Sequence, residues 1–434
     1  MARTFIGGIH PSEEKRTKNC PIEKVPAAAF VSIPLLQHIG SPATPLVKVG
    51  DRVLKGQMIA SCAPGLSCPV HASVSGVVSA IETKAVPSGE GVVITIENDF
   101  KEELCPSVSP FPKPLFQASP EEITEYIREK GITGMGGASF PTWAKIESGR
   151  GKAETILVNC AECEPYLTAN HRLLLEQPQQ VIGGVKILLR ATGAKKVIFA
   201  VEDNKKDAVQ CLAALLDGKE NAAVCVLKTK YPQGDERQLI RAIYRKEIPK
   251  GSLPADVGVL IFNAETCWAV YRAFVLGLPV IERILTVSGD CVKNPANLLV
   301  PIGVSFGEIL SRCGGFVKKP DKLIAGGPMM GTAQWSESVP VTKGVAGILA
   351  ISAPKYESGV CIHCGRCVRA CPMHLMPLEL YRSVQAENMD EVRLYGVSIC
   401  NECGSCTYVC PSRIPILQNI RVGKDMLKHS ATQK

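Results

Sequence analysis

Two runs of four cysteines near the C-terminus are the residues best suited to redox chemistry. The first run reads Cys-x2-Cys-x2-Cys-x3-Cys-Pro, and the second repeats the same spacing. Three thiolates two residues apart can hold three irons of one cubane, while the fourth, ahead of a chain-turning proline, points at the other cluster. We therefore predict two [4Fe–4S] clusters. Their ligands would be Cys361, Cys364, Cys367 and Cys410 for one cluster, and Cys400, Cys403, Cys406 and Cys371 for the other.

A pair of zinc sites is the alternative, because any two Cys-x2-Cys pairs can bind zinc with tetrahedral geometry. A doubled run of four cysteines, each closed by Cys-Pro, favours the clusters. Clusters carry one electron at a time, so the rest of the chain should hold a group that supplies or removes electrons. Between the runs, apolar residues recur near helical spacing at Leu378, Tyr381, Val384, Val392 and Tyr395. This spacing predicts a helical cluster domain.

A glycine-rich loop is the second segment suited to chemistry. Residues 134–145 read Gly-Met-Gly-Gly-Ala-Ser-Phe-Pro-Thr-Trp-Ala-Lys. A Rossmann fingerprint would follow a strand, whereas this loop follows a predicted helix that Ser119, Pro120 and Glu122 begin with a capping box. Glycine backbone N–H groups can approach a phosphate or a flat ring, with Lys145 in reach of the anion. A plain loop is the alternative.

The elements that would position this loop form a βα alternation in the middle of the chain. Strands are predicted at 156–158, 197–201, 224–227 and 257–262. Helix-like segments separate them, which predicts a largely parallel sheet. Three polar loops follow strands, at 159–165, 231–236 and 263–266. Ligands of open α/β sheets bind outside the carboxyl ends of strands, so we expect a cofactor at these loops.

Short β-rich runs precede this sheet, between Val47 and Val78. They predict a small barrel of hairpins that resembles the lipoyl and biotinyl carriers. In those carriers a lysine at a hairpin tip holds the cofactor, but the corresponding tip here, Cys62 to Cys68, contains none. We therefore expect a structural barrel, with a swinging arm as the alternative.

A further small unit follows the sheet, from Arg283 to Lys318. A strand-like run precedes a helix that Ser305 and Glu308 begin as a capping box and that ends at the glycine pair after residue 313. This unit resembles the β-grasp module called SLBB. We expect a tight glycine turn at 326–331 and a linker near Pro354 before the cluster domain.

Composition restricts the class of protein. A chain of 434 residues with 46% hydrophobic residues suits about three globular domains. A net charge of +8 is mild for this length and does not indicate nucleic-acid binding. An odd count of 19 cysteines is unlike a disulfide scaffold and suits a reducing compartment. No signal peptide or membrane-spanning segment is apparent, so we expect a cytoplasmic chain that contacts a membrane only through partners.

Several motifs occur together in one order. They are the glycine loop with Phe140 and Lys145, then Asn159-x-x-Glu162-x-Glu164, then Gly234-Asp235-Glu236, then Asn263-x-Glu265-Thr266. Their order is similar to that in the flavin- and NADH-binding subunit of respiratory complex I. An N-terminal Gly-Gly-Ile-His-Pro segment, the barrel and the two cysteine runs are absent there. With them, the whole chain resembles the C subunits of Rnf electron-transport complexes.

The resemblance implies a multidomain α/β fold. It comprises a lipoyl/biotinyl-type β-barrel, a Rossmann-like flavin and NADH domain, an SLBB β-grasp module and a helical two-cluster ferredoxin domain. We place their boundaries at 1–105, 117–282, 283–353 and 354–434.

The same resemblance implies which residues bind the cofactors. FMN would be held by Gly134, Gly136, Lys145, Asn159 and Asn263. Phe140, Glu162, Glu164 and Glu236 would lie near the flavin or the nicotinamide of NAD(H), with Gly137, Gly234 and Thr266 in the same motifs. Complex I has glycine at Ser139 and aspartate at Ala161, so this chain departs from the pattern at two positions. Cys160 and Cys163 form an additional Cys-x2-Cys pair for which a redox or metal role is an alternative.

The function implied is hydride exchange between NADH and FMN, followed by one-electron transfer through the clusters. Transfer of a hydride needs no acid or base, so no catalytic side chain is assigned. The resemblance implies membrane-embedded and iron–sulfur partner subunits that couple electron flow to Na+ or H+ movement. Ferredoxin would be the distant redox partner, and the chain would be peripheral on the inner face of the membrane. The alternatives are an NADH-dependent protein that feeds a soluble reductase, and a flavin-free electron wire.

Overall fold

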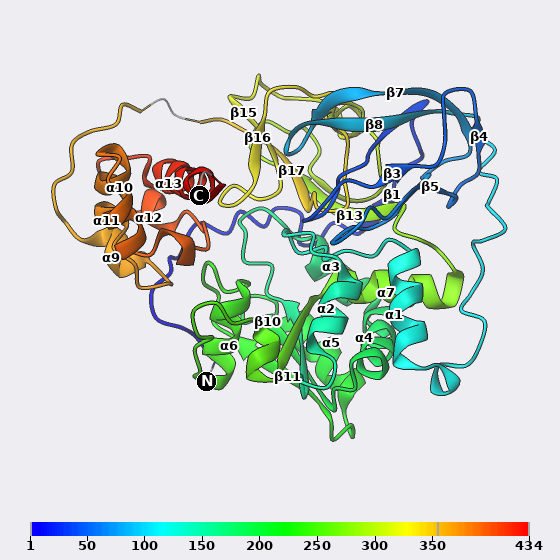
Figure 1. Ribbon diagram of the computed structural model, residues 1–434, viewed down its shortest axis with the longest axis horizontal. Coiled ribbons are helices and arrows are strands. Elements are labelled where there is room, and N and C mark those ends of the chain that lie inside the picture. Colours follow the sequence, from blue (N-terminus) through cyan, green and yellow to red (C-terminus); the bar gives the residue numbers. More distant parts are fainter. Residues whose placement is uncertain (1, 354–355, 433–434) are drawn as a thin grey trace.

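A computed structural model describes residues 2–353 and 356–432 (Figure 1). It is a multidomain α/β structure in which the helical C-terminal unit lies beside the larger part of the molecule. The linker predicted at Pro354 lies outside the described residues. Within those residues, no helix is both long and apolar enough to cross a bilayer.

The N-terminal unit contains two small antiparallel sheets whose buried residues belong to one core, which they share with the third unit. One sheet has the order β2-β8-β7-β4 and the other β3-β5-β6. Their strands are β2 (Phe30–Pro34), β3 (Thr44–Pro45), β4 (Arg52–Val53), β5 (Met58–Ser61), β6 (Val70–His71), β7 (Gly76–Val86) and β8 (Gly89–Asn98). Alternating inward residues such as Val31, Ile33, Ile94 and Ile96 are fully buried, as expected for strands with one face on a core. The predicted barrel of hairpins is confirmed.

The central unit is a four-stranded parallel sheet with the order β11-β10-β9-β12. Its strands are β9 (Thr155–Cys160), β10 (Lys196–Glu202), β11 (Ala222–Leu227) and β12 (Val259–Asn263). All four fall where strands were predicted. Alternate residues of the strands point to opposite faces, and both faces are covered. Ile156 and Val158 pack under one group of helices, whereas Leu157 packs against α6.

The helices of this unit are α1 (Pro120–Glu129), α2 (Thr142–Gly149), α3 (Ala169–Glu176), α4 (Pro178–Thr192), α5 (Lys206–Leu216), α6 (Glu236–Tyr244) and α7 (Ala264–Leu276). Two short 3-10 helices, η1 (Leu115–Gln117) and η2 (Pro254–Val257), accompany them. The capping box that starts α1 is confirmed, because the Ser119 and Glu122 side chains each accept a hydrogen bond from the other residue's backbone N–H. The glycine-rich loop therefore follows a helix, as expected.

The third unit is a mixed six-stranded sheet with the order β1-β14-β13-β17-β15-β16. Its elements are β1 (Ile22–Lys24), β13 (Glu282–Ser288), β14 (Ala296–Pro301), α8 (Phe306–Arg312), β15 (Lys322–Ala325), β16 (Thr332–Gln334) and β17 (Gly347–Ile351). Ser305 caps α8 by accepting from the Glu308 N–H. The edge strand β1 comes from the N-terminal segment, which crosses the molecule and joins units far apart in sequence (Figure 1).

The C-terminal unit is helical between the cysteine runs, as predicted. It contains α9 (Arg366–Ala370), α10 (Pro377–Gln385), α11 (Met389–Leu394), η3 (Val397–Ile399), α12 (Ser405–Tyr408) and α13 (Ile416–Thr432). Leu380, Val384, Val392 and Ile420 form its core together with several of the cysteines. All nineteen cysteines of the chain are free, and none is fully exposed.

Candidate functional site: a glycine loop beside two cysteine sets

The predicted cofactor residues gather at the carboxyl edge of the central sheet. The chain runs from β9 through β10 to β11 and then returns to place β12 on the other side of β9. Strand order therefore reverses between β9 and β12, and ligands of α/β sheets bind at such switch points. Asn263 ends β12, Asn159 is the penultimate residue of β9, and the two are direct neighbours across the ladder. Both were predicted to hold FMN, and the fold brings them together.

The glycine loop closes over this switch point. The Gly134 N–H donates to the Phe140 carbonyl at 2.8 Å, and the Met135 N–H donates to the Thr266 hydroxyl at 2.9 Å. Gly136 lies so close to Asn263 that an added Cβ would stand 3.2 Å from its side chain. Gly137 has a φ of +124°, a conformation that favours glycine. Residues 136–138 are exposed, and the absence of side chains at the two glycines leaves their backbone open to a flat, phosphorylated ligand. We call this loop and the ends of β9 and β12 the flavin cradle, after the ligand predicted from the sequence.

Lys145 and Glu236 meet at the rim of the cradle. The Lys145 ammonium lies 2.6 Å from the Glu236 carboxylate and also donates to the Ile261 carbonyl at 3.0 Å. Asn159 donates from its amide to the Gly234 carbonyl at 2.8 Å, which ties the predicted 234–236 motif to the end of β9. A bound phosphate would have to compete with Glu236 for Lys145 or share it.

A buried ion pair supports the loop from below. Arg283 and Glu265 are 0% and 1% exposed in their side chains and lie 2.7 Å apart. Arg283 also donates to the Met135 carbonyl of the glycine loop and to the Lys343 carbonyl. Burial raises the pKa of Glu265, and Arg283 opposes that shift. Sequence reasoning assigned no role to Arg283, because the two charges are separated in sequence and no local spacing joins them.

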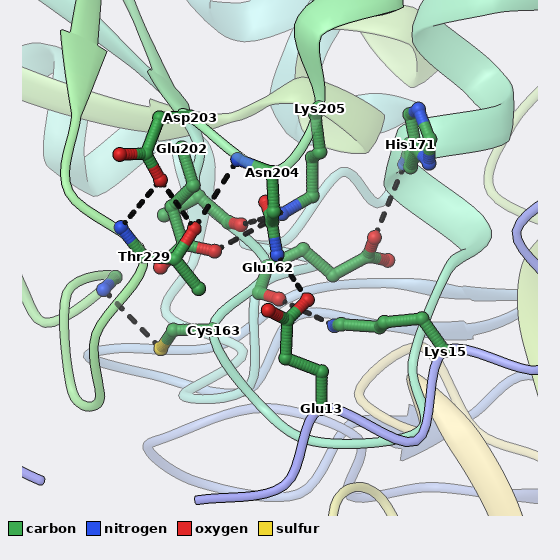
Figure 2. Close-up of polar contacts among 12 residues, drawn as sticks. Glu13, Lys15, Glu162, Cys163, His171, Glu202, Asp203, Asn204, Lys205 and Thr229 are labelled. Carbon is green, nitrogen blue, oxygen red and sulfur yellow. Dashed lines mark hydrogen bonds and ion pairs between the residues drawn. The ribbon is translucent and has the colours of Figure 1, made fainter. Parts of the chain in front are cut away.

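Two lysines hold the loop that follows β9 (Figure 2). Lys15 donates to three backbone carbonyls, those of Glu162, Glu164 and Leu167, at 2.8, 2.8 and 2.6 Å. Lys205 donates to the Ala161 carbonyl at 2.6 Å and pairs with the buried carboxylate of Glu202 at 3.0 Å. Sequence reasoning missed both lysines.

Glu162 lies inside this loop in a left-handed backbone conformation, with φ +49°. Its carboxylate accepts hydrogen bonds from the Asn170 and His171 N–H groups at the start of α3. A non-glycine residue with positive φ is strained and persists only where its surroundings impose it. The two lysines and the first turn of α3 supply that constraint, so they fix the course of a loop predicted to face the cofactors.

Replacing Lys15 by methionine should weaken FMN retention. The change removes the donor from three part-buried carbonyls, and an unsatisfied buried polar group costs about 1–3 kcal/mol. The loop should then relax and FMN should dissociate more readily, which equilibrium dialysis would measure. Lys15→Arg, which keeps a donor, should retain more FMN than Lys15→Met. Exposed Lys18, three residues later, gives the matched control Lys18→Met, which should bind FMN normally. Equal affinity in Lys15→Met and Lys18→Met would contradict this role.

Glu164 is held by the third unit and does not point freely into the cradle. Its two carboxylate oxygens accept from the Met329 and Met330 N–H groups at 3.0 and 2.8 Å. Gly327 packs against the same carboxylate, with no room for a Cβ. Burial raises the pKa of Glu164 to about 7, although the two N–H donors oppose the shift. The predicted glycine turn at 326–331 therefore binds the loop that follows β9 through these two hydrogen bonds.

The two departures from the complex I pattern have local explanations. Ser139 keeps a positive φ of +50° where complex I has glycine, and its hydroxyl lies against Gly344, which has no room for a Cβ. Ala161 is fully buried, and its N–H donates to the Asn159 side chain at 3.2 Å. Both positions therefore shape the loops rather than expose a polar group.

The Cys160 and Cys163 side chains belong to different parts of the structure. Cys160 is buried in the core beneath the helices, and burial raises the pKa of its thiol. Cys163 packs with Tyr231 and Cys403 in a separate apolar cluster and accepts from the Gly234 N–H at 3.3 Å. The pair is not disulfide-bonded.

The first set of predicted cluster ligands surrounds a cavity of about 100 Å³. Cys361, Cys364, Cys367 and Cys410 all line it, so the cysteine that joins the first run at this cavity comes from the second run, as predicted for the ligand set. The Cys361 sulfur accepts the His363 N–H at 3.4 Å. No three His, Cys, Asp or Glu side chains of the described residues converge into a ready-made site for a metal ion. The four thiols instead face a shared space whose donor chemistry fits a cluster.

The second set is more deeply buried. Cys371, Cys403 and Cys406 are buried, and Cys371, Cys400 and Cys403 lie close enough to Cys406 to raise the pKa of its thiol. Burial is the main cause and brings the pKa of Cys406 to about 12. Cluster assembly must therefore release protons. The Cys371 and Cys400 sulfurs accept the Leu375 and Glu402 N–H groups.

The two runs share one backbone pattern. Left-handed residues occur at matching places, at His363 and Glu402, at Gly365 and Gly404, and at His374 and Arg413. A short helix follows each glycine. The repeat in sequence is therefore a repeat in structure, which places the fourth cysteine of each run beside the other run.

The second set lies against the loop that precedes α6. The Tyr231 hydroxyl, from the loop before α6, donates to the Cys403 carbonyl at 2.8 Å. Met329 packs near Gly404 on the same side. The N-terminal segment also contacts the C-terminal unit here, because the Gly8 N–H donates to the Ala370 carbonyl at 2.8 Å. No local sequence motif predicts these contacts, because they join residues that are far apart in the chain.

Comparison with known families matches all four units. The RnfC barrel sandwich hybrid domain matches residues 3–101, the Nuo51 FMN-binding domain residues 127–272, the SLBB domain residues 284–333 and the 4Fe-4S dicluster domain residues 360–414. The C subunit of the Na(+)-translocating ferredoxin:NAD(+) oxidoreductase complex of Acetobacterium woodii is 42% identical over 97% of this chain and 96% of its own length.

This chain belongs to the C-subunit family of ion-translocating oxidoreductase complexes. Two more members of the family are 42% identical to it. They are the C subunits of the proton-translocating ferredoxin:NAD(+) oxidoreductase complex of Clostridium ljungdahlii, over 87% of this chain and 83% of that one, and of the ion-translocating oxidoreductase complex of Rhodobacter capsulatus, over 99% and 84%. The C-subunit fold also resembles a chain of an NAD+-reducing [NiFe]-hydrogenase, with a TM-score of 0.53, 17% identity, and coverage of 72% of this chain and 65% of that one.

The family membership confirms the predicted fold class and cofactor content. As a member of this family, the chain combines an FMN-binding domain with a 4Fe–4S dicluster domain and is one part of a multisubunit oxidoreductase.

Proposed function

We propose that this chain exchanges electrons between NAD(H) and two [4Fe–4S] clusters within a ferredoxin:NAD+ oxidoreductase complex. One observation carries the proposal: the loop that begins at Tyr231 borders the flavin cradle at Gly234 and contacts the buried cysteine set through Cys403. In this proposal one loop therefore borders both the site of hydride transfer and the buried cluster, which carries single electrons. FMN bound in the cradle would supply the conversion between hydride transfer and single-electron transfer.

Each group of residues has a separate task in this proposal. Gly134, Gly136 and Gly137 would admit the flavin, with Asn159, Asn263 and Thr266 fixing the cradle. Lys145 would face the phosphate, and Phe140, Gly234 and Glu236 would shape the nicotinamide side. Glu162 and Glu164 would act by fixing the loop that follows β9. Two sets of four cysteines would hold the clusters. No side chain is assigned as an acid or base, because the transfer of a hydride requires none.

The setting of the chain is part of the proposal. We place it on the inner, cytoplasmic face of the membrane, bound to membrane-embedded and iron–sulfur subunits, with ferredoxin as the distant redox partner. The ion is left open, because relatives named for Na+ and for H+ translocation are equally similar. The division of the chain into domains at 1–105, 117–282, 283–353 and 354–434 is also part of the proposal.

An anaerobic absorbance spectrum before and after addition of NADH would test the function. The purified chain should contain one FMN and about eight irons, as two cubanes require. NADH should bleach the flavin bands and then the cluster bands. Eight irons without flavin and without any NADH response, even after FMN is supplied, would favour the flavin-free electron wire. Full activity that never depends on membrane subunits would favour a protein that feeds a soluble reductase.

A further inference from the structure

We propose that the face around the outer cysteine set is a docking surface for an acidic one-electron carrier protein. This inference rests on the proposed function, because it concerns where electrons leave or enter the clusters. The face is defined by Cys361, Cys364, Cys367 and Cys410 and by the exposed residues that border their cavity.

The two cysteine sets differ in access to solvent. The inner set contacts Tyr231 and the N-terminal segment, so its surroundings are closed by this chain. The outer set lines a cavity whose rim is exposed, and none of its four cysteines is fully buried. One electron can cross between redox centres without breaking a bond or moving a proton, provided that the partner's centre comes close. Of the two sets, the outer one offers that approach.

The rim carries exposed apolar side chains. Val360 is 89% exposed and Ile362 65% exposed, and Val368 and Met376 beside them are partly exposed. The last three line the cavity itself. Large apolar side chains that gather on one face mark an interaction site, whereas scattered ones do not.

Positive charge surrounds the same rim. Arg366, Arg369, Arg382 and Arg413 are all exposed. The Arg366 side chain makes no hydrogen bond or ion pair with any residue that the structure describes, whereas Arg382 pairs with Glu379 at 3.4 Å.

Acidic side chains of the same domain are mostly engaged or located elsewhere. Glu402 binds Arg421 and Lys424, and Asp390 and Glu391 lie on α11. Two carboxylates remain near the rim: Glu357 is exposed, and Glu379, which pairs with Arg382, lines the cavity itself. An apolar patch inside an excess of arginines suits a partner whose redox centre is ringed by carboxylates.

Charge reversal at Arg366 would test the docking. The full chain carrying FMN and clusters is photoreduced and mixed in a stopped-flow instrument with an oxidised two-[4Fe–4S] ferredoxin of net negative charge. Arg366→Glu should lower the second-order rate about tenfold at low salt, and the difference should shrink at high salt as charges are screened. Arg366→Lys, which keeps the charge, should react at nearly the natural rate.

Lys195→Glu is the matched control, because Lys195 is exposed at the opposite edge of the central sheet and the charge change is the same. Val360→Asp, one residue before Cys361, should also slow the reaction, while Phe116→Asp, at another exposed apolar side chain far from the cysteine runs in sequence, should not. Equal rates for Arg366→Glu and Lys195→Glu at low salt would overturn the proposal. Because photoreduction replaces NADH, a failure of NADH to bleach the flavin would contradict the proposed function alone.

Discussion

A chain with Cys371 replaced by serine should lose the inner cluster and retain the outer one. Cys371 belongs to the first run in sequence, but it lies with Cys400, Cys403 and Cys406 of the second. Its loss removes one of four thiolates from a site in which each iron needs a ligand. We expect the iron content to fall by about half, and we expect NADH to reduce the remaining cluster far more slowly, because the inner cluster is the one beside the flavin cradle.

Cys410→Ser is the matched variant, because it removes a cysteine from the outer set and leaves the inner set intact. It should lose a similar amount of iron but keep rapid reduction of the remaining cluster by NADH, since the contact between Tyr231 and Cys403 is untouched. Flavin bleaching should persist in both variants. Iron analysis and rapid-freeze EPR after mixing with NADH would measure these effects. If Cys371→Ser kept fast cluster reduction while Cys410→Ser lost it, the assignment of inner and outer clusters would be reversed.

Local chemistry made several parts of this structure predictable. The strands of the central sheet are apolar runs bounded by polar loops, so their positions followed from pattern alone. The capping box at Ser119 and Glu122 is a short-range signal, since both hydrogen bonds join residues three apart. The spacing of the cysteine runs likewise predicted which cysteines lie together. A repeated backbone turn places Cys371 and Cys410 each beside the opposite run.

Contacts between distant segments could not be predicted in this way. Lys15 is 147 residues from the first carbonyl that it binds, and Tyr231 is 172 residues from Cys403. A lone lysine in a charged N-terminal segment reads as a solvated residue until the fold is known. The same applies to Glu164, which looks like a ligand of the cofactor in sequence and is held by the Met329 and Met330 N–H groups in space.

Replacing Arg283 by methionine should cost the most stability of any single change at the flavin cradle. The substitution leaves the Glu265 carboxylate buried without its partner, and removal of one member of a buried pair costs about 3–5 kcal/mol. It also removes the donors to the Met135 and Lys343 carbonyls. FMN should therefore be released at a lower urea concentration, as followed by flavin fluorescence.

Two further variants separate the effect of the buried Glu265 charge from the effect of the hydrogen bonds that Arg283 donates. Arg312→Met removes an arginine from an exposed pair with Glu308, where about 0–1 kcal/mol is expected, and should leave FMN release unchanged. The double variant Arg283→Met with Glu265→Gln removes the uncompensated charge, so it should recover part of the loss. Recovery would show that the buried carboxylate is the main penalty, because the double variant lacks the same arginine donors as the single one. If the double variant is no more stable than Arg283→Met, the arginine acts through its hydrogen bonds to the glycine loop. If Arg283→Met releases FMN at the same urea concentration as Arg312→Met, the pair does not support the cradle.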